Sequence, residues 1–215
     1  MKPLSERIGA ASIGGLYAIT PDEPDTAALA RKVHLALRGG ARVVQYRNKC
    51  AGAALRLEQA QALRGLTREF RALLIVNDDV LLAQQIDADG VHLGATDGNL
   101  AEARRTLGGA KYLGASCYNR LELAHAAVAQ GADHVAFGSF FASTVKPDAV
   151  AATPELLRQA QRELNVPLVA IGGITVQNGA QLIAAGADAL AVISALFGAA
   201  DIEDAARQFS GLGFQ

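Results

Sequence analysis

The chain has 215 residues, of which 51% are apolar and 19% charged, and its formal net charge is −1. This composition excludes a disordered chain, and the lack of a basic run argues against nucleic acid or an anionic membrane as a partner. No apolar run is long enough to span a membrane, and the first residues lack the apolar core of a signal peptide. Cys50 and Cys117 have no metal-ligand spacing. We therefore expect a cytoplasmic protein with reduced thiols.

Apolar, strand-like runs alternate with helical runs from Gly15 onward. The strand-like runs cover residues 15–20, 41–47, 72–78, 90–94, 111–116, 134–140, 167–174 and 189–197. Strands that alternate with helices pair in parallel, and eight such units in about 200 residues are typical of a closed barrel. The sequence predicts an α/β fold, a single (β/α)8 TIM barrel over residues 15–215 with residues 1–14 as a lead-in. An open, doubly wound sheet is the second possibility.

A short turn recurs where a helix ends and the next strand begins. It occupies residues 38–41, 87–90, 131–134 and 186–189. Glycine in such a turn favours a left-handed end to the helix, and these turns lie at the N-terminal face of the barrel, where residues serve stability. We therefore interpret Asp89, Asp133 and Asp188 as structural.

Polar residues gather where the third and fourth strand-like runs end. Asn77 and Asp78 follow one run and Asp97 follows the next. The C-terminal ends of parallel strands lie at the same edge of a sheet, so the two carboxylates are expected to converge, and oxygen ligands of this kind suit Mg²⁺. The alternative is that both aspartates cap the helices that follow them.

The second strand-like run ends in Gln45, Arg47 and Lys49, which share one parity and would face one side if the strand continued. Arginine and lysine at a strand end suit phosphate, although a solvated strand end is equally open. Ser116 ends the fifth run. The long connection of residues 139–153 carries Ser143, Thr144 and Lys146, and loops of this length are usually functional.

The seventh and eighth runs end in Gly172-Gly173 and in Ile193-Ser194. Barrels of this kind often bind a phosphate group there through backbone N–H groups. A tight turn is the alternative. Together with the cations of the second run, these residues predict two anion sites, one suited to a diphosphate and one to a monophosphate. The four histidines are interpreted as packing residues, and His92 is the strongest exception because it precedes Asp97 closely.

The motifs QYRNK, VNDD, DGVHLGATD, LGAS, STVK, VAIGGI and VIS follow one another in this order. This series resembles the thiamine phosphate synthase family over nearly the whole chain. The resemblance implies a (β/α)8 barrel that joins 4-amino-2-methyl-5-hydroxymethylpyrimidine diphosphate to 4-methyl-5-(2-phosphoethyl)thiazole. The products would be thiamine phosphate and pyrophosphate. It also implies a dissociative mechanism, in which diphosphate departs before the thiazole nitrogen attacks.

The resemblance also implies a role for particular residues. Mg²⁺ would be held by Asp78 and Asp97, and catalysis would rest on Arg47, Lys49, Ser116 and Lys146. The pyrimidine diphosphate would be bound by Gln45, Tyr46, Arg47, Asn48, Lys49, Asn77, Ser116 and Lys146. The thiazole phosphate would be bound by Ser143, Thr144, Val145, Gly173, Ile193 and Ser194.

The chain departs from the family pattern at three places. Asn48 stands where a glutamate is usual, and Val145 stands where threonine is common. Gly94-Ala95-Thr96-Asp97 stands where the family usually has Gly-Gln-x-Asp, so an amide is lost and the aspartate remains. None of these changes removes an expected metal ligand or cation. They bear on affinity for the substrates more than on the type of reaction.

Two other functions fit parts of the same pattern. A thiazole tautomerase-like barrel would need the phosphate loops of the last two strands but not the metal and diphosphate residues. A non-catalytic barrel that binds thiazole phosphate or thiamine phosphate would need no leaving-group residues. The presence of Asp78, Asp97, Arg47, Lys49 and Lys146 favours the synthase. We further expect residues 140–150 to close over the substrates and bring in Lys146. The sequence gives no oligomeric state.

Overall fold

The strands alternate with helices along the whole barrel, as the computed structural model of the chain shows for residues 12–94, 98–142 and 151–214. The strands are β1 (Gly15–Ile19), β2 (Val43–Tyr46), β3 (Leu73–Asn77), β4 (Gly90–Leu93), β5 (Tyr112–Tyr118), β6 (His134–Phe137), β7 (Leu168–Ile171) and β8 (Ala189–Val192). The helices are α2 (Thr26–Arg38), α3 (Ala53–Glu69), α4 (Val80–Gln85), α5 (Leu100–Leu107), α6 (Leu121–Ala129), α7 (Pro154–Glu163), α8 (Val176–Ala184), α9 (Ser194–Phe197) and α10 (Ile202–Ser210).

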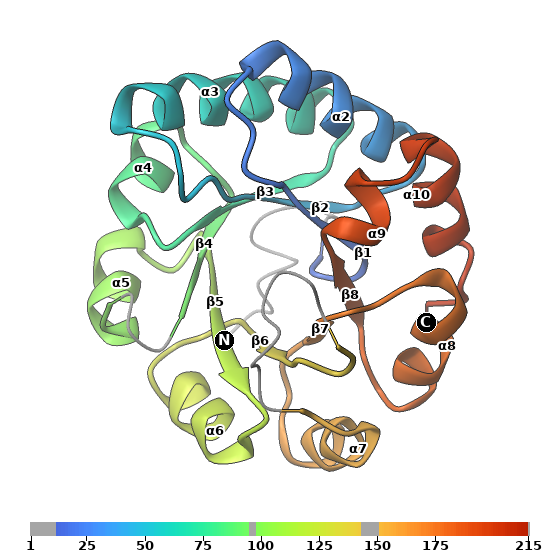
Figure 1. Ribbon diagram of the computed structural model, residues 1–215. Helices are drawn as coiled ribbons and strands as arrows, with labels where there is room; N and C mark the ends of the chain where they lie inside the picture. The colour runs from blue at the N-terminus through green and yellow to red at the C-terminus, as the bar shows by residue number, and fades with distance from the viewer. Residues whose placement is uncertain (1–11, 95–97, 143–150, 215) are drawn as a thin grey trace.

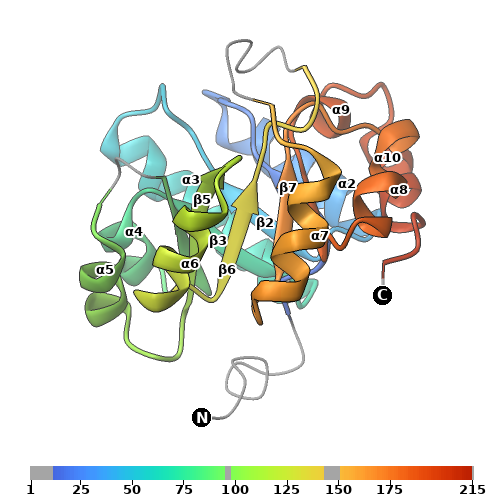
Figure 2. The same cartoon turned by 90° about the horizontal axis from the view of Figure 1, so that it is seen from below.

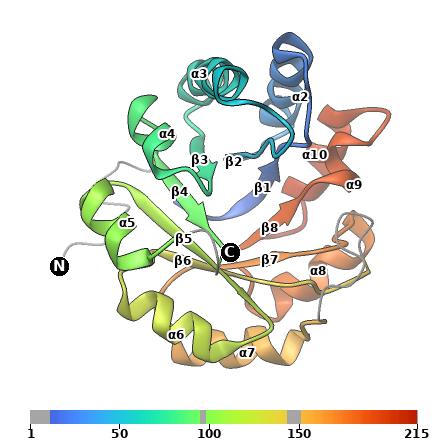
Figure 3. The same ribbon diagram turned by 60° about the vertical axis from the view of Figure 1, so that its left-hand side comes forward.

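Within these residues, eight parallel strands close into a barrel in sequence order, and β8 pairs with β1. The predicted (β/α)8 barrel is thereby confirmed, and the doubly wound alternative is wrong. Figure 1 shows the helices as a ring outside the strands. The ring is closed by α10, which packs beside α2 (Figure 3).

Two apolar layers follow from the alternation of side chains along each strand. On β1, Leu16 and Ala18 pack outward against the helices, whereas Tyr17 and Ile19 point into the barrel. Ile13 joins the interior layer, so the described part of the predicted lead-in contributes to the core at its N-terminal end. No helix in the described part of the chain combines the length and apolar character that crossing a membrane requires.

The three aspartates of the N-terminal turns are structural, as predicted. Each lies before an even-numbered strand and accepts a hydrogen bond from the start of the odd-numbered strand before it. Asp89 accepts from the Leu74 backbone N–H at 2.8 Å, Asp133 from Leu113 at 2.9 Å and Asp188 from Leu168 at 2.7 Å. Arg64 and Arg104 form ion pairs with Asp89 and Asp133. These contacts fix the N-terminal rim of the barrel.

The opposite, C-terminal rim carries the loops from which a site can be built. The short helix α9 lies at this rim directly after β8 (Figure 2). The predicted eighth strand was too long, because residues 194–197 form this helix. The second strand was also too long, since it ends at Tyr46.

Candidate active site

The loop after β2 is held in place by hydrogen bonds to two residues of the β1–α2 connection. The hydroxyl of Thr20 accepts from the backbone N–H of Arg47 and donates to its carbonyl, both at 2.8 Å. These two bonds take the backbone groups that would have continued the strand. Asp22 accepts from the backbone N–H of Lys49 at 2.7 Å and lies 3.4 Å from the guanidinium of Arg47. Both cationic residues of the loop, Arg47 and Lys49, are thus bound to the β1–α2 connection.

A common direction for Gln45, Arg47 and Lys49 requires the strand to continue to Lys49, and this condition is not met because β2 ends at Tyr46. Gln45 is buried and its amide donates to the Tyr17 hydroxyl at 2.9 Å inside the barrel. Arg47 turns toward Asp22, as stated above, and the ammonium of Lys49 lies 3.6 Å from Asp78. The two cations are brought to the same rim by the loop and not by strand alternation.

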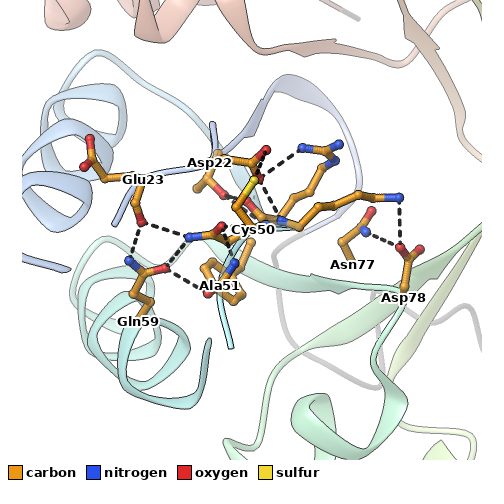
Figure 4. A network of polar contacts seen from close by, with 12 residues as sticks. Asp22, Glu23, Cys50, Ala51, Gln59, Asn77 and Asp78 are labelled. Atoms are coloured by element: carbon orange, nitrogen blue, oxygen red, sulfur yellow. Dashed lines mark hydrogen bonds and ion pairs between the residues drawn. The ribbon is translucent and has the colours of Figure 1, made fainter. Parts of the chain in front are cut away.

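The side chains of Tyr46 and Asn48 have structural partners. The Tyr46 hydroxyl and the Asn48 amide both donate to Oε1 of Gln59 on α3, at 2.9 and 3.0 Å. The Asn48 amide also donates to the Glu23 carbonyl, and its oxygen accepts from two backbone N–H groups in the same loop. Figure 4 shows the hydrogen bonds that join Gln59 to Glu23 and to this loop. A glutamate at position 48 has no N–H to donate, so the chain's departure from the family pattern matches its own neighbours.

Asn77 and Asp78 lie across from this loop at the end of β3. The Asn77 amide donates to the Asp78 carboxylate at 2.6 Å (Figure 4). Asp78 has a φ of 64°, in the left-handed region that aspartate tolerates better than most side chains. Backbone conformations of this kind are concentrated at functional sites.

The cap interpretation of Asp78 is wrong, because the neighbouring residue performs that task. The carboxylate of Asp79 accepts from the Leu82 N–H at 2.9 Å and caps α4. Asn99 caps α5 in the same way. The carboxylate of Asp78 is therefore directed at the rim, 28% exposed and beside Lys49.

A small cavity of about 60 Å³ lies between this rim and the first turns of α3 and α4. Its polar lining includes Asn48, Lys49, Arg56, Asn77, Asp78 and Asp79. A water molecule occupies roughly 30 Å³ of liquid, so the cavity has room for an ion or a few waters and not for an organic substrate.

The Ser116 side chain contacts a histidine inside the barrel. Its hydroxyl lies 3.0 Å from Nε2 of His92, and Nδ1 of His92 lies 3.4 Å from Nε2 of His134. His134 is fully buried. The other two histidines pack outside the barrel, His34 against the ring of Phe70 and His125 beside Glu163. The interpretation as a packing residue thus holds for His34, whereas His125 is exposed beside Glu163 and His92 contacts a residue of the candidate site.

The glycines after β7 permit a close approach between two loops. Gly172 and Gly173 have φ values of 105° and 61°. A Cβ on Gly172 would lie 2.0 Å from the Ser139 hydroxyl, and one on Gly173 would lie 2.3 Å from the Ala142 carbonyl. The backbone N–H of Phe141 donates to the Gly172 carbonyl at 3.0 Å. The beginning of the β6–α7 connection is therefore packed onto the end of β7.

Known proteins resemble this chain over most of its length. The family model described as "Thiamine monophosphate synthase" matches residues 16–196. The chain belongs to this family. A thiamine-phosphate synthase from Methylobacillus flagellatus is 56% identical over 93% of this chain and 95% of its own length. One from Nitrosospira multiformis is 53% identical over 93% and 86%, respectively. The solved structure of a thiamine phosphate pyrophosphorylase from Pyrococcus furiosus is 36% identical, with a TM-score of 0.85 over 95% of this chain and 97% of that one.

Membership in the thiamine monophosphate synthase family makes the chain a transferase. Several residues that the sequence assigned to the site lie outside the described residues. They are Asp97, Ser143, Thr144, Val145 and Lys146, together with the family departures Ala95 and Thr96 and the predicted closure of residues 140–150 beyond Ala142. In the described part of the chain, no group of three or more His, Cys, Asp or Glu side chains could hold a metal ion.

The sequence analysis missed Thr20 and Asp22. Both follow β1, and the rule that polar residues at the C-terminal ends of barrel strands form the site applies to β1 as to the other strands. The segment TPDEPD after the first strand carried that signal.

Proposed function

We propose that this member of the thiamine monophosphate synthase family joins 4-amino-2-methyl-5-hydroxymethylpyrimidine diphosphate to 4-methyl-5-(2-phosphoethyl)thiazole. The proposal rests on one observation at the ends of β2 and β3. There Lys49 pairs with Asp78, Asn77 donates to Asp78, and Asp22 holds Arg47 in the same loop as Lys49. Two cations beside an amide and a carboxylate suit a diphosphate group better than a single phosphate. The relatives named thiamine-phosphate synthase support the same reaction.

Arg47 and Lys49 would bind the oxygens of the diphosphate. Their present partners leave them available for this role, because the ion pairs with Asp22 and Asp78 span 3.4 and 3.6 Å at a partly exposed rim. Such pairs are weak, and a diphosphate carries more negative charge than either carboxylate. Lys146 would add a further cation and Ser116 a hydroxyl. Gln45 and Asn77 would contact the pyrimidine, with the backbone at Tyr46 and Asn48 beside them.

Mg²⁺ is proposed as the metal, held by Asp78 and Asp97. Of the two aspartates, Asp78 lies within the described residues. It suits a metal ligand, because its carboxylate is directed at the rim and does not cap a helix. Magnesium commonly binds through one or two carboxylates and completes its coordination with water and substrate phosphates. When bound, it would supply positive charge that neutralises the departing diphosphate.

The thiazole phosphate would lie on the other side of the barrel mouth. Gly173, Ile193 and Ser194 follow β7 and β8, and Ser194 is exposed at the start of α9. Loops after the last two strands and a short extra helix often bind phosphate in this fold. Ser143, Thr144 and Val145 would complete this subsite.

The proposed reaction is dissociative. The bond between the pyrimidine methylene carbon and the diphosphate oxygen breaks first, and the electron pair leaves with diphosphate. The thiazole nitrogen then donates its lone pair to the methylene cation. The chain's residues would hold the leaving group and align the nucleophile, and no side chain is required to remove a proton. The proposed location is the cytoplasm, where the free thiols of Cys50 and Cys117 would stay reduced.

The experiment is pyrophosphate release from the two substrates, with and without Mg²⁺, by the wild type and by Asp78→Asn. We expect release to require Mg²⁺, to match thiamine phosphate formed, and to fall about a hundredfold or more in the variant. Asp79→Asn is the matched control. It removes a carboxylate one residue away and keeps the helix cap, because asparagine caps as well as aspartate.

An equal loss in both variants would remove Asp78 from the site. No pyrophosphate release by a folded wild type that isomerises a thiazole phosphate would identify a tautomerase instead. Binding of thiazole phosphate without any turnover would identify a non-catalytic binding protein.

A further inference from the structure

A line of three polar side chains crosses the barrel interior toward the site. It runs from His134 on β6 through His92 on β4 to Ser116 on β5. Nε2 of His134 lies 3.4 Å from Nδ1 of His92, and Nε2 of His92 lies 3.0 Å from the Ser116 hydroxyl. Only Ser116 has a role in the proposed reaction. The two histidines behind it have none so far.

The strands are built to admit this pair of rings. His92 and His134 are both register partners of Gly114, which lies between them on β5. A Cβ on Gly114 would lie 2.2 Å from Nε2 of His134 and 2.4 Å from Nδ1 of His92. No other residue therefore allows the two rings to meet over this strand.

His134 is neutral. Its side chain is fully buried, and burial, reinforced by the neighbouring His92, holds the pKa of His134 well below its ordinary value of 6.5. The ring of Tyr17 covers it from another strand, with ring centroids 6.3 Å apart. A neutral imidazole has one N–H donor and one bare nitrogen, so the hydrogen bonds along the line have a direction.

With one proton on each ring, the line has two directions, and they place different groups at the inner end. If Ser116 donates to His92 and His92 donates to His134, the only N–H of His134 is at Nδ1. That atom is buried and has no hydrogen-bond partner among the described residues. If the line runs the other way, Nδ1 is a bare nitrogen. Buried N–H groups without an acceptor are the rarer of the two defects.

The chemistry at Ser116, the outer end of the line, favours the same direction, with His92 donating to Ser116. The non-bridging oxygens of a diphosphate, most of which are ionised at neutral pH, act chiefly as hydrogen-bond acceptors. A Ser116 hydroxyl whose hydrogen was already committed to His92 could not donate to it. A Ser116 that accepts from His92 has its own hydrogen free for the anion.

We infer that His134 and His92 are positioning residues that orient the Ser116 hydroxyl. Nε2–H of His134 donates to Nδ1 of His92, and Nε2–H of His92 donates to Oγ of Ser116, whose hydrogen then points to the diphosphate. The identity of the anion rests on the proposed function. The direction of the hydrogen bonds is a property of the substrate-free protein.

The direction is tested by two-bond ¹⁵N–¹H correlation spectra of protein labelled at histidine, without substrates. His34→Gln and His125→Gln assign the signals of the two outer histidines. We expect the proton on Nε2 and not on Nδ1 in both His92 and His134. An Nδ1–H tautomer at either ring, or a doubly protonated His134, would overturn the inference whatever the enzyme catalyses.

The consequence for the anion is tested by calorimetric binding of inorganic pyrophosphate with Mg²⁺. His134→Leu removes the donor to His92, and we expect about tenfold weaker binding, the usual loss when a hydrogen bond to a charged group is impaired. His134→Gln retains an N–H and should bind within about twofold of the wild type. Equal binding by the Leu and Gln variants would show that His134 only fills space, and would overturn the positioning role.

Ser116→Ala separates this inference from the proposed function. If pyrophosphate binding is unchanged in Ser116→Ala, the proposed role of Ser116 fails and with it the positioning role of the histidines. If Ser116→Ala binds weakly while His134→Leu binds normally, the proposed role of Ser116 stands and the inference fails.

Discussion

The two rims of the barrel use the same residue types in opposite ways. At the N-terminal rim, Asp89 and Asp133 bind a backbone N–H group and an arginine each, so their charge is matched within the chain. At the C-terminal rim, Arg47 and Lys49 face carboxylates at 3.4 and 3.6 Å in longer, partly exposed pairs. Charges that are fully matched stabilise the fold, whereas loosely matched charges are left to bind a ligand. Substitutions at the two rims should therefore affect different properties.

Arg47→Ala should give the largest effect, and on activity alone. Removing one preorganised donor to a departing anion commonly costs about a hundredfold in rate. The free energy of unfolding should change by less than about 1 kcal/mol, because the lost ion pair is partly exposed and Thr20 still holds the backbone at this position. Steady-state kinetics and denaturant unfolding measure the two quantities.

Arg68→Ala is the matched control, since Arg68 also pairs with an aspartate, Asp87, but at the other rim. Its activity should equal that of the wild type. Arg47→Lys keeps the charge without the forked donor and should lie between Arg47→Ala and the wild type. A large loss of stability in Arg47→Ala with unchanged turnover by the folded protein would reverse the assignment of the two rims.

Asp133→Ala should have the opposite signature. It removes the acceptor of the Leu113 N–H and the partner of Arg104 in one step. Charged hydrogen bonds of this kind are worth about 1.5–3 kcal/mol each, and we expect a loss of roughly 2–3 kcal/mol in the free energy of unfolding. Turnover per folded molecule should stay within about twofold of the wild type, because the site lies at the other rim.

Glu122→Ala, which removes a well-exposed acid in the first turn of α6, provides the baseline for loss of one carboxylate. It should cost less than about 0.5 kcal/mol. If Asp133→Ala costs no more than Glu122→Ala, the aspartates of the N-terminal turns are not stabilising contacts.

Asp188→Asn should have the smallest effect and the clearest dependence on pH. No arginine pairs with Asp188 among the described residues, and partial burial of the carboxyl raises the pKa of Asp188 above its ordinary value of 3.8, although the residue as a whole is exposed. The folded protein then binds a proton that the unfolded chain has released. The wild type should therefore lose stability, relative to the variant, as the pH rises from 3.8 through the raised pKa.

Above that range Asp188→Asn should be at least as stable as the wild type, since asparagine still accepts from the Leu168 N–H. Unfolding free energies measured from about pH 4 to pH 7 test this sign. A variant that is less stable than the wild type at neutral pH, with no relative change on acidification, would contradict it.

The barrel itself could be predicted from the sequence because each element carries a local signal. Apolar strands alternate with helices, and Gly40, Gly131 and Gly186 have the left-handed φ values that their turns require. Asp89, Asp133 and Asp188 could also be placed, since the N-terminal rim determines their role. These features depend on neighbours in the chain or on the topology alone.

The site was less predictable because it depends on contacts between distant segments. The strand containing Arg47 stops because Thr20 takes its backbone groups, and no periodicity in the strand itself reveals this. The buried amide of Asn48 is explained only by Gln59 and Glu23. Asp78 and Asp79 are adjacent acids of one type, and only the structure assigns the cap to Asp79.

The hydrogen bonds of Asp89, Asp133 and Asp188 also group the strands of the barrel in pairs. Each ties an even-numbered strand to the odd-numbered strand before it, so that β3 with β4, β5 with β6 and β7 with β8 form three similar β–α–β–α units. A quarter of the barrel is then the smallest piece whose internal contacts repeat. Such a piece is a natural unit to exchange between related barrels in recombination experiments.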